Sequence, residues 1–341
     1  MTPAIHGIHH LTAIARDPQA NLEFYTRVLG LRLVKKTVNF DDPTAYHLYY
    51  GDATGSPGSI VTFFTWPEGV SAGRTGTGQV ARVSFSAAPE ALPFWQKRLS
   101  ALGMASSATE RFGEEVLAFS DPDGITVEIV GVTQDARAGW LVRDIPTPYS
   151  LRGLHTAELV VSAAPATEAL ITRDMGYRLV QRRGPRARFE TGHGGSGAYI
   201  DVVAAPADAP RGLGGIGTIH HIAWRVPTDA TQVGMQRRLN QGGLQVSPVR
   251  DRNYFRSIYF RDPSGVLFEI ATDEPGFGVD EPLSALGTGL KLPAELERAR
   301  EQIEKRLPPL RDPARAGSAT PSIVSTHKHT YHEYTHQDRL S

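Results

Sequence analysis

The sequence predicts an α+β fold assembled from four copies of one β-α-β-β-β module. Three observations lead to this prediction. The same strand-and-helix pattern begins four times, two of the copies end in the same hairpin turn, and 34 glycines with 24 prolines among 341 residues indicate many turns between short strands. A chain of this length exceeds one ordinary hydrophobic core, so we expect two domains.

The first module is expected at residues 6–66. It opens with an extended run, after which Asp17 and Pro18 combine a favoured N-cap residue with a favoured first helical residue. Apolar residues from Leu22 to Leu29 fall on one helical face. Three more extended runs complete the module, at 31–38, 45–50 and 59–65.

The same order of elements returns three times, in modules expected at 79–132, 152–205 and 217–272. The second and fourth modules end with related turns, DPDG and DPSG, in which Pro is second and Gly fourth. Aligning these turns places Glu128 on Glu269. The shared turn and strand order favour true repetition over a chance likeness between mixed α+β segments.

The domain boundaries follow from the modules. We expect a first domain at 1–140 from the first pair of modules and a second at 150–275 from the second pair, with a proline-containing linker at 133–151. Residues 276–341 are expected to form a C-terminal amphipathic helix, at 293–307, followed by a polar, His-rich tail.

Composition excludes several functional classes. The 36 Lys and Arg residues balance the 36 Asp and Glu residues, which argues against a nucleic-acid or membrane-surface partner. The absence of cysteine excludes disulfide scaffolds, zinc–thiolate sites and cysteine nucleophiles. The sequence has neither an apolar run of about 20 residues nor the apolar core of a signal peptide at its start, so we expect a cytoplasmic protein.

Two His-His pairs stand at the same place in two modules. His9-His10 opens the first strand of the first module, and His220-His221 opens that of the fourth. Because side chains alternate along a strand, only one member of each pair can face the concave side of the sheet. Alternate residues on the side of His10 are more polar than those on the side of His9. The side of His220 is apolar enough to pack against a helix, whereas the side of His221 is not. These patterns favour His10 and His221 as the inward members.

Glu269 lies within an apolar run, VLFEIA. A carboxylate in such a strand is costly unless it is paired or bound to a cation. Two imidazoles and one carboxylate form the facial triad that is typical of non-haem Fe(II) with three open positions. The sequence therefore predicts a metal held by His10, His221 and Glu269.

The remaining candidates are interpreted as structural. The strand that opens the module of Glu128 has no histidine, and the third module has Thr156 where the others have a predicted ligand, so we interpret Glu128 as structural. Histidines outside the pairs are expected to pack, to lie in loops or to belong to the tail: His6, His47, His155, His193, His327, His329, His332 and His336.

The stretches GIHHLT, TIHHIAW and LFEIATDEPGF resemble the vicinal oxygen chelate superfamily, which has the glyoxalase and extradiol dioxygenase fold. More narrowly, they are similar to the ring-cleaving dioxygenases that open hydroquinones. The resemblance covers nearly the whole chain. It implies curved mixed sheets, a metal cup shared by the first and fourth modules, and Fe(II), with Mn(II) as the other possibility, at His10, His221 and Glu269.

The resemblance also implies roles around the metal. Positions that surround the ligands in the family match His9, Thr12, His220, Arg252 and Tyr259. Arg252 and Thr12 would bind substrate, whereas Tyr259 and one of the flanking histidines would transfer protons. The implied reactants are a hydroquinone-like or catechol-like aromatic diol and O2, and a homo-oligomer is compatible with the long apolar strands.

Two other functions suit the same modules. One is a glyoxalase-like or epimerase-like lyase or isomerase that uses Zn²⁺, Ni²⁺ or Co²⁺ without dioxygen and commonly has more carboxylate ligands. The other is an antibiotic-sequestering binding protein, which would need a cleft but no complete triad. Oxygen uptake with an aromatic diol separates the first from a dioxygenase, and metal analysis tests the second.

Overall fold

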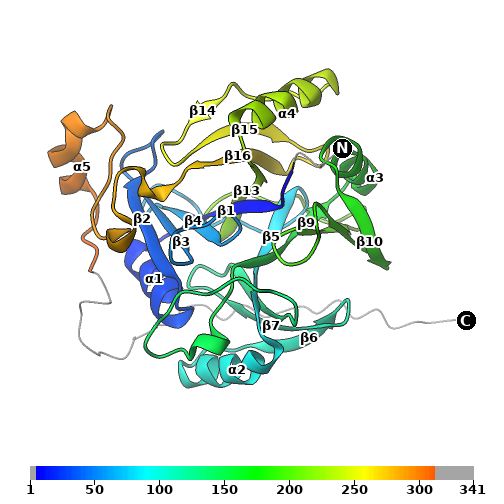
Figure 1. The fold of residues 1–341 in the computed structure, drawn as a ribbon, viewed down its shortest axis with the longest axis horizontal. Helices are drawn as coiled ribbons and strands as arrows, with labels where there is room; N and C mark the ends of the chain where they lie inside the picture. Colours follow the sequence, from blue (N-terminus) through cyan, green and yellow to red (C-terminus); the bar gives the residue numbers. More distant parts are fainter. Residues whose placement is uncertain (1–4, 312–341) are drawn as a thin grey trace, which may run out of the picture.

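The computed structural model describes residues 5–311 and contains two eight-stranded mixed sheets (Figure 1). The first sheet has the order β14-β15-β16-β13-β1-β4-β3-β2. Its strands are β1 (Ile8–Ala15), β2 (Arg32–Val38), β3 (Tyr46–Gly51), β4 (Ile60–Thr65), β13 (Thr218–Val226), β14 (Arg250–Asp251), β15 (Phe255–Arg261) and β16 (Leu267–Pro275).

The second sheet has the order β10-β11-β12-β9-β5-β8-β7-β6. Its strands are β5 (Gln79–Ala87), β6 (Ser107–Arg111), β7 (Glu114–Ser120), β8 (Thr126–Gly131), β9 (Leu154–Val161), β10 (Arg178–Arg183), β11 (Arg186–Glu190) and β12 (Tyr199–Ala204). The expected α+β class with curved mixed sheets is confirmed.

Each sheet joins one module from either half of the chain. The first sheet contains the first and fourth modules, and the second contains the second and third. The central contacts are antiparallel pairings of opening strands, β1 with β13 and β5 with β9. The sheets thus do not follow the ranges 1–140 and 150–275, and the division into those two domains stays a prediction.

The helices lie outside the sheets. They are α1 (Pro18–Glu23), α2 (Leu92–Ala101), α3 (Ala164–Ala169), α4 (Asp229–Gln241) and α5 (Arg300–Arg306). In Figure 1, α4 lies over β15 and β16, and α2 lies at the opposite end of the molecule. The apolar faces of the helices and sheets form a nearly continuous core.

Local sequence accounts for the start of the first helix. The carboxylate of Asp17 accepts hydrogen bonds from the backbone N–H groups of Gln19 and Ala20, and Pro18 is the first helical residue, as predicted. The helix does not continue regularly to residue 29. After Glu23 it widens into a π-helical turn at 24–28, and the third module repeats this turn at 170–174. A 3.6-residue apolar period does not distinguish such a turn from an α-helix.

The C-terminal helix is shorter than expected. A 3-10 turn at 297–299 precedes α5, and only Ile303 and Leu307 of its predicted face are fully buried. The predicted His-rich tail lies outside the described residues. Within residues 5–311, no helix combines the length and the apolar character needed to cross a bilayer.

Candidate metal centre

Three adjacent strands of the first sheet bring the predicted ligands together. His10 lies on β1, His221 on β13 and Glu269 on β16, and the strand register sets Thr12 opposite His221. One potential ligand atom from each of the three residues lies within 4.8 Å of the others. The Nε2 atom of His221 is 2.8 Å, and that of His10 is 3.5 Å, from Oε2 of Glu269. His10 and His221 both face Glu269, as expected, but His220 also lines the adjoining cavity, so both members of the second pair reach it.

The donor set fits a divalent transition metal. Nε2 of His221 and Oε2 of Glu269 are buried and face each other at 2.8 Å without hydrogen-bond geometry, and among the described residues neither atom has a hydrogen-bond partner. Two buried polar atoms arranged in this way are costly unless a cation lies between them. Burial acts to raise the pKa of Glu269, but the neighbouring His10 and His221 hold it well below its usual range. A carboxylate kept ionised beside two imidazoles is the ligand chemistry of a two-histidine, one-carboxylate site.

In each histidine pair, the first residue is positioned to orient the second, which is the candidate ligand. The Nδ1 atoms of His9 and His10 are 2.9 Å apart, and those of His220 and His221 are 2.7 Å apart. An imidazole that binds a metal through Nε2 carries its hydrogen on Nδ1, so His10 and His221 would donate to His9 and His220. Burial lowers the pKa of His9 and of His221, which favours neutral rings.

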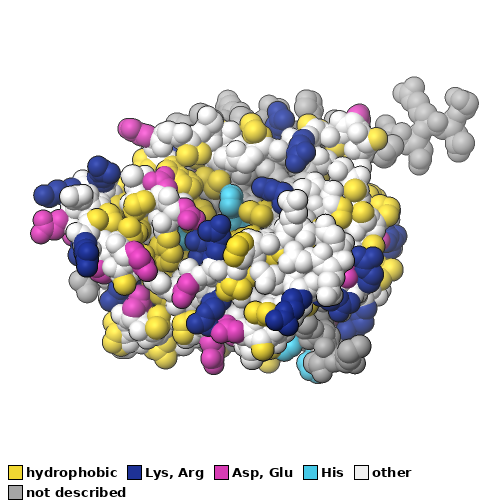
Figure 2. Space-filling model, turned by 90° about the horizontal axis from the view of Figure 1, so that it is seen from above, with side chains coloured by type: hydrophobic (Ala, Val, Ile, Leu, Met, Phe, Trp, Pro, Cys, Tyr) yellow, Lys and Arg dark blue, Asp and Glu magenta, His cyan; other side chains and the backbone are white. Residues whose placement is uncertain are grey.

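The site opens into a cavity of about 480 Å³, a size suited to a small molecule. Besides the three candidate ligands, the walls include Thr12, Asn39, Phe64, Trp66, His220, Arg252, Phe255 and Tyr259. Figure 2 shows histidine side chains near the middle of the face viewed, between apolar and basic side chains. Aromatic walls with a few polar groups suit a flat aromatic ligand.

Arg252 and Tyr259 lie together on one wall of this cavity. Tyr259 pairs with Glu269 across β15 and β16, and Nε of Arg252 donates to the Tyr259 hydroxyl at 3.2 Å. Burial, together with the charge of Glu269, raises the pKa of Tyr259, so the phenol stays protonated. Arg252 also lies 3.4 Å from Asp41. Of the eight predicted site residues, seven therefore line this cavity, and the eighth, His9, contacts His10 from outside the lining.

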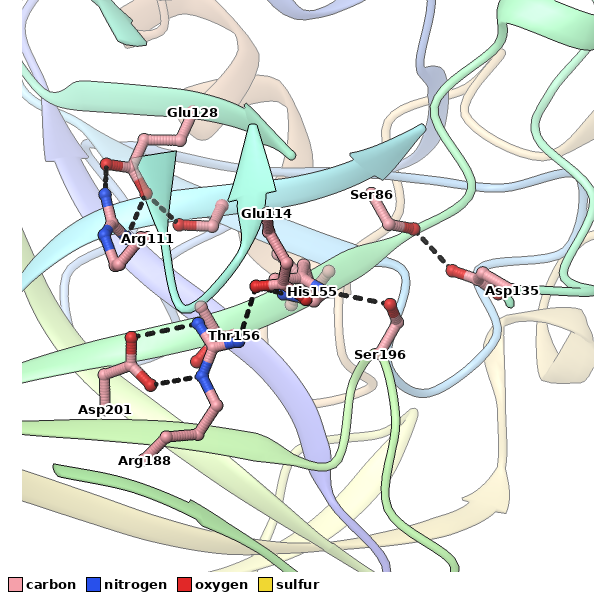
Figure 3. Close-up of polar contacts among 12 residues, drawn as sticks. Ser86, Arg111, Glu114, Glu128, Asp135, His155, Thr156, Arg188, Ser196 and Asp201 are labelled. Atoms are coloured by element: carbon pink, nitrogen blue, oxygen red, sulfur yellow. Dashed lines mark hydrogen bonds and ion pairs between the residues drawn. The ribbon is translucent and has the colours of Figure 1, made fainter. Parts of the chain in front are cut away.

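The corresponding region of the second sheet is filled by ion pairs (Figure 3). Glu128 accepts hydrogen bonds from Arg111, Arg82 and Ser84. Next to it, His155 contacts Ser196 at 2.8 Å and Glu114 at 3.1 Å. Two guanidinium groups thus satisfy the carboxylate that corresponds to Glu269, which supports the interpretation of Glu128 as structural.

His47, expected to be a packing or loop residue, does pack against the rings of Tyr49 and Phe64, but it also lines the cavity. His47 lies on β3 and lines the cavity beside Tyr49. It contacts the Tyr49 hydroxyl and the Thr62 hydroxyl, each at 2.9 Å. Sequence reasoning missed it because His47 has no histidine neighbour and its contact to Thr62 joins two different strands. The only available signal was a histidine within an otherwise apolar and aromatic strand.

Comparison with known proteins agrees with this architecture. A family model described as the Glyoxalase/Bleomycin resistance protein/Dioxygenase superfamily matches residues 7–129 and 153–270. A Bacillus subtilis protein named "Putative ring-cleaving dioxygenase MhqO" is 44% identical over 89% of this chain and 96% of its own length. The chlorohydroquinone/hydroquinone 1,2-dioxygenase of Sphingobium indicum is 31% identical over 88% of this chain and 95% of its own.

Solved structures give the same result. A crystal structure titled as a putative dioxygenase from Bacillus subtilis has a TM-score of 0.87 and 43% identity, and the match covers 91% of this chain and 99% of that one. Glyoxalase I from Zea mays, at 14% identity, shares only the fold, with a TM-score of 0.59 over 78% of this chain and 92% of its own. Because the family model matches both halves of the chain and the repeated modules form the same paired sheets, the chain belongs to the glyoxalase, bleomycin resistance protein and dioxygenase superfamily.

Proposed function

We propose that the chain is a ring-cleaving dioxygenase that acts on a hydroquinone-like aromatic diol, or on a catechol-like one, and incorporates both atoms of O2. The observation that carries the proposal is the convergence of two imidazoles and one carboxylate on an aromatic-walled cavity that also contains Arg252 and Tyr259. The names and the extended similarity of the two relatives described above support the same reaction class.

The metal proposed for the site is Fe(II), with Mn(II) as the alternative. His10, His221 and Glu269 would hold it, leaving three positions open. When bound, a divalent redox-active metal would increase the acidity of a coordinated phenol and bring the diol and dioxygen into contact. His9 and His220 would keep the two imidazole ligands in the tautomer that leaves Nε2 free.

The other residues of the cavity would bind the diol and move protons. The Arg252 guanidinium would stabilise negative charge on a phenolate oxygen or on a carboxylate formed by ring opening. Tyr259, held protonated beside Arg252, would donate a proton or a hydrogen bond to the same oxygen. His220 also lines the cavity. When its Nδ1 accepts from His221, its hydrogen lies on Nε2, so it would donate a hydrogen bond to the ligand, and the aromatic walls would exclude bulk water.

The reaction class is tested by oxygen consumption. The protein is purified without oxygen, loaded with Fe(II), and assayed in an oxygen electrode with hydroquinone, catechol, and the adduct of methylglyoxal with glutathione. We expect oxygen uptake with an aromatic diol and none with the adduct. Turnover of the adduct without oxygen uptake would instead assign a glyoxalase-like lyase, and inertness toward all aromatic diols would refute the proposal.

The ligand set is tested by Glu269→Gln. Loss of the only carboxylate is expected to weaken metal binding by at least about 100-fold and to abolish turnover, because the amide cannot supply the anionic oxygen. Metal content by elemental analysis and oxygen uptake check this. Glu128→Gln is the matched control, because it alters the corresponding strand position outside the cavity. Equal metal content and turnover in wild type and Glu269→Gln would remove Glu269 from the ligand set.

A further inference from the structure

Four side chains, of which three are buried and one, His47, is half-buried, form a hydrogen-bonded chain across three strands of the first sheet. The Tyr49 hydroxyl contacts Nδ1 of His47, and Nε2 of His47 contacts the Thr62 hydroxyl, each at 2.9 Å. Thr62 donates to the Thr12 hydroxyl, again at 2.9 Å. The chain runs from β3 through β4 to β1 and ends at Thr12, which lies two residues from His10 and lines the cavity.

The direction of this chain follows from its last bond. The geometry permits only Thr62 to donate between the two threonines, so the single hydroxyl hydrogen of Thr62 is used there. Thr62 must then accept from His47, which places the imidazole hydrogen on Nε2. Nδ1 of His47 is left as an acceptor, and Tyr49 donates to it. Burial and the nearby His10 hold the pKa of His47 well below its usual value, which is compatible with this neutral ring.

Thr12 receives a hydrogen bond and keeps its own hydrogen. No acceptor for that hydrogen is present among residues 5–311, although Thr12 is only 1% exposed and lines the cavity. Successive hydrogen bonds that all point in the same direction polarise one another, and this effect is larger in a buried environment of low dielectric constant. The hydroxyl of Thr12 is therefore oriented to donate to whatever oxygen occupies the cavity.

We propose that the Tyr49–His47–Thr62 chain holds Thr12 as a hydrogen-bond donor to the ligand and thereby makes the site select the phenolate form of an aromatic diol over the neutral phenol. Thr62 is a positioning residue: it is fully buried, does not line the cavity, and acts only through Thr12. A phenolate oxygen is charged and can only accept hydrogen bonds, so a hydroxyl held as a donor stabilises it more than it stabilises a neutral phenol. This inference rests on the proposed function, since it assumes that the cavity binds a phenol.

The test uses 4-nitrophenol, whose phenolate absorbs visible light and whose neutral form does not. Binding is titrated across pH to protein loaded with Zn²⁺, which does not undergo redox chemistry with dioxygen, and is repeated with metal-free protein. Thr62→Val removes the chain with little change in volume. Thr62→Ser restores the hydroxyl. Thr65→Val is the matched control, because Thr65 is buried on the same strand and its hydroxyl has no hydrogen-bond partner among the described residues.

We expect Thr62→Val to weaken binding of the phenolate about fivefold to tenfold, the effect of losing about one ordinary hydrogen bond, because Thr12 remains but is no longer held as a donor. The bound probe should ionise at a higher pH than in wild type, in both metal states. Thr62→Ser and Thr65→Val should behave as wild type. A purely structural role for Thr62 would lower thermal stability without changing the ionisation of the bound probe.

Two results would overturn the inference in distinguishable ways. If wild type binds 4-nitrophenol and Thr62→Val shows the same affinity and spectrum as Thr65→Val, the chain has no influence on the ligand and only this inference fails. If wild type does not bind the probe in either metal state, this inference fails as well, whereas the proposed function is decided separately by oxygen uptake with the aromatic diols. Should Thr62→Val not fold, Tyr49→Phe replaces it; removing the first donor is expected to weaken phenolate binding about twofold, and an unchanged affinity would refute the chain.

Discussion

Glu269 and Glu128 occupy equivalent strand positions but have different partners. Glu269 lies beside two imidazoles and retains a buried oxygen without a hydrogen-bond partner, whereas Glu128 is enclosed by Arg82 and Arg111. Burial opposes ionisation in both, and the neighbours outweigh it in both. The two carboxylates differ in the oxygen that stays available: guanidinium groups occupy the lone pairs of Glu128, whereas Oε2 of Glu269 has no hydrogen-bond partner among the described residues and can bind a cation.

The histidine pairs lead to a prediction about metal affinity. His9→Phe and His220→Phe each keep an aromatic ring but remove the Nδ1 acceptor that orients a neighbouring ligand. We expect each variant to bind metal about 10- to 100-fold more weakly, because the ligand loses its preferred tautomer and orientation. Competition with a chromophoric chelator measures this affinity.

His6→Phe is the control for these two variants. His6 is exposed and does not line the cavity, so its replacement is expected to leave metal affinity unchanged. Affinities for His9→Phe and His220→Phe equal to that of the control would mean that the flanking histidines do not orient the ligands.

At the scale of elements, the two sheets use equivalent strands for different purposes. In the first sheet, β1, β13 and β16 place a carboxylate beside histidines; in the second, β5, β8 and β6 place the corresponding carboxylate beside arginines. Repetition of one backbone module therefore conserves the position of a side chain while its cross-strand neighbours decide what it does.

The ion-pair cluster of the second sheet predicts that the free energy of unfolding depends on pH in the acidic range. The arginines lower the pKa of Glu128 to about 2 although burial acts to raise it, compared with 4.5 for an ordinary glutamate. A depressed carboxylate pKa contributes stability that is complete above pH 4.5 and is lost as the pH falls toward 2. We expect Glu128→Gln to unfold more easily at pH 7 and to show a smaller further loss of stability between pH 4.5 and 2 than wild type.

Urea unfolding at several pH values measures this effect. Removing one such group should reduce the slope of unfolding free energy against pH by up to about 1.4 kcal/mol per pH unit within that window. Glu115→Gln changes an exposed glutamate on the neighbouring strand β7 and should leave the slope unchanged. Parallel curves for wild type and Glu128→Gln would contradict the assignment of this stability to Glu128.

At the scale of the whole molecule, the segment after β16 is fastened to the first module by Lys35. This side chain is completely buried on β2, and its ammonium group lies 2.5 Å from carboxylate oxygens of both Asp280 and Glu281. The same group donates to the carbonyl oxygen of Phe277. The end of the fourth module is thereby tied to the far edge of the sheet that contains the candidate metal centre.

This contact predicts a large effect on stability. Lys35→Met should lower the unfolding free energy by about 3–5 kcal/mol, because Glu281 remains buried without a counter-charge. The double variant Lys35→Met/Glu281→Gln should recover part of the loss, and Lys36→Met, on the same strand and less buried, should stay within about 0.5 kcal/mol of wild type. Denaturant unfolding measures all three. A loss for Lys35→Met no larger than for Lys36→Met would contradict a fastening role.

Much of the site was predictable because it is encoded locally. A His-His pair at a strand start and a glutamate in an apolar strand are visible within about six residues, and strand alternation then identifies His10 and His221 as the inward members. The capped start of the first helix was equally local. The π-helical turns were not predictable, because they retain the apolar spacing of an ordinary helix.

The sequence by itself determined the four modules, their α+β character and the three candidate ligands, since repeated patterns and side-chain chemistry are properties of short segments. The family resemblance also implied that the first and fourth modules come together, and the shared sheet confirms this. Only the tertiary structure decided that arginines enclose Glu128 and that His47 and Thr62 connect to Thr12. These are contacts between strands far apart in the chain. Their energies depend on register and burial in the folded sheet, and neither quantity exists until the strands have paired.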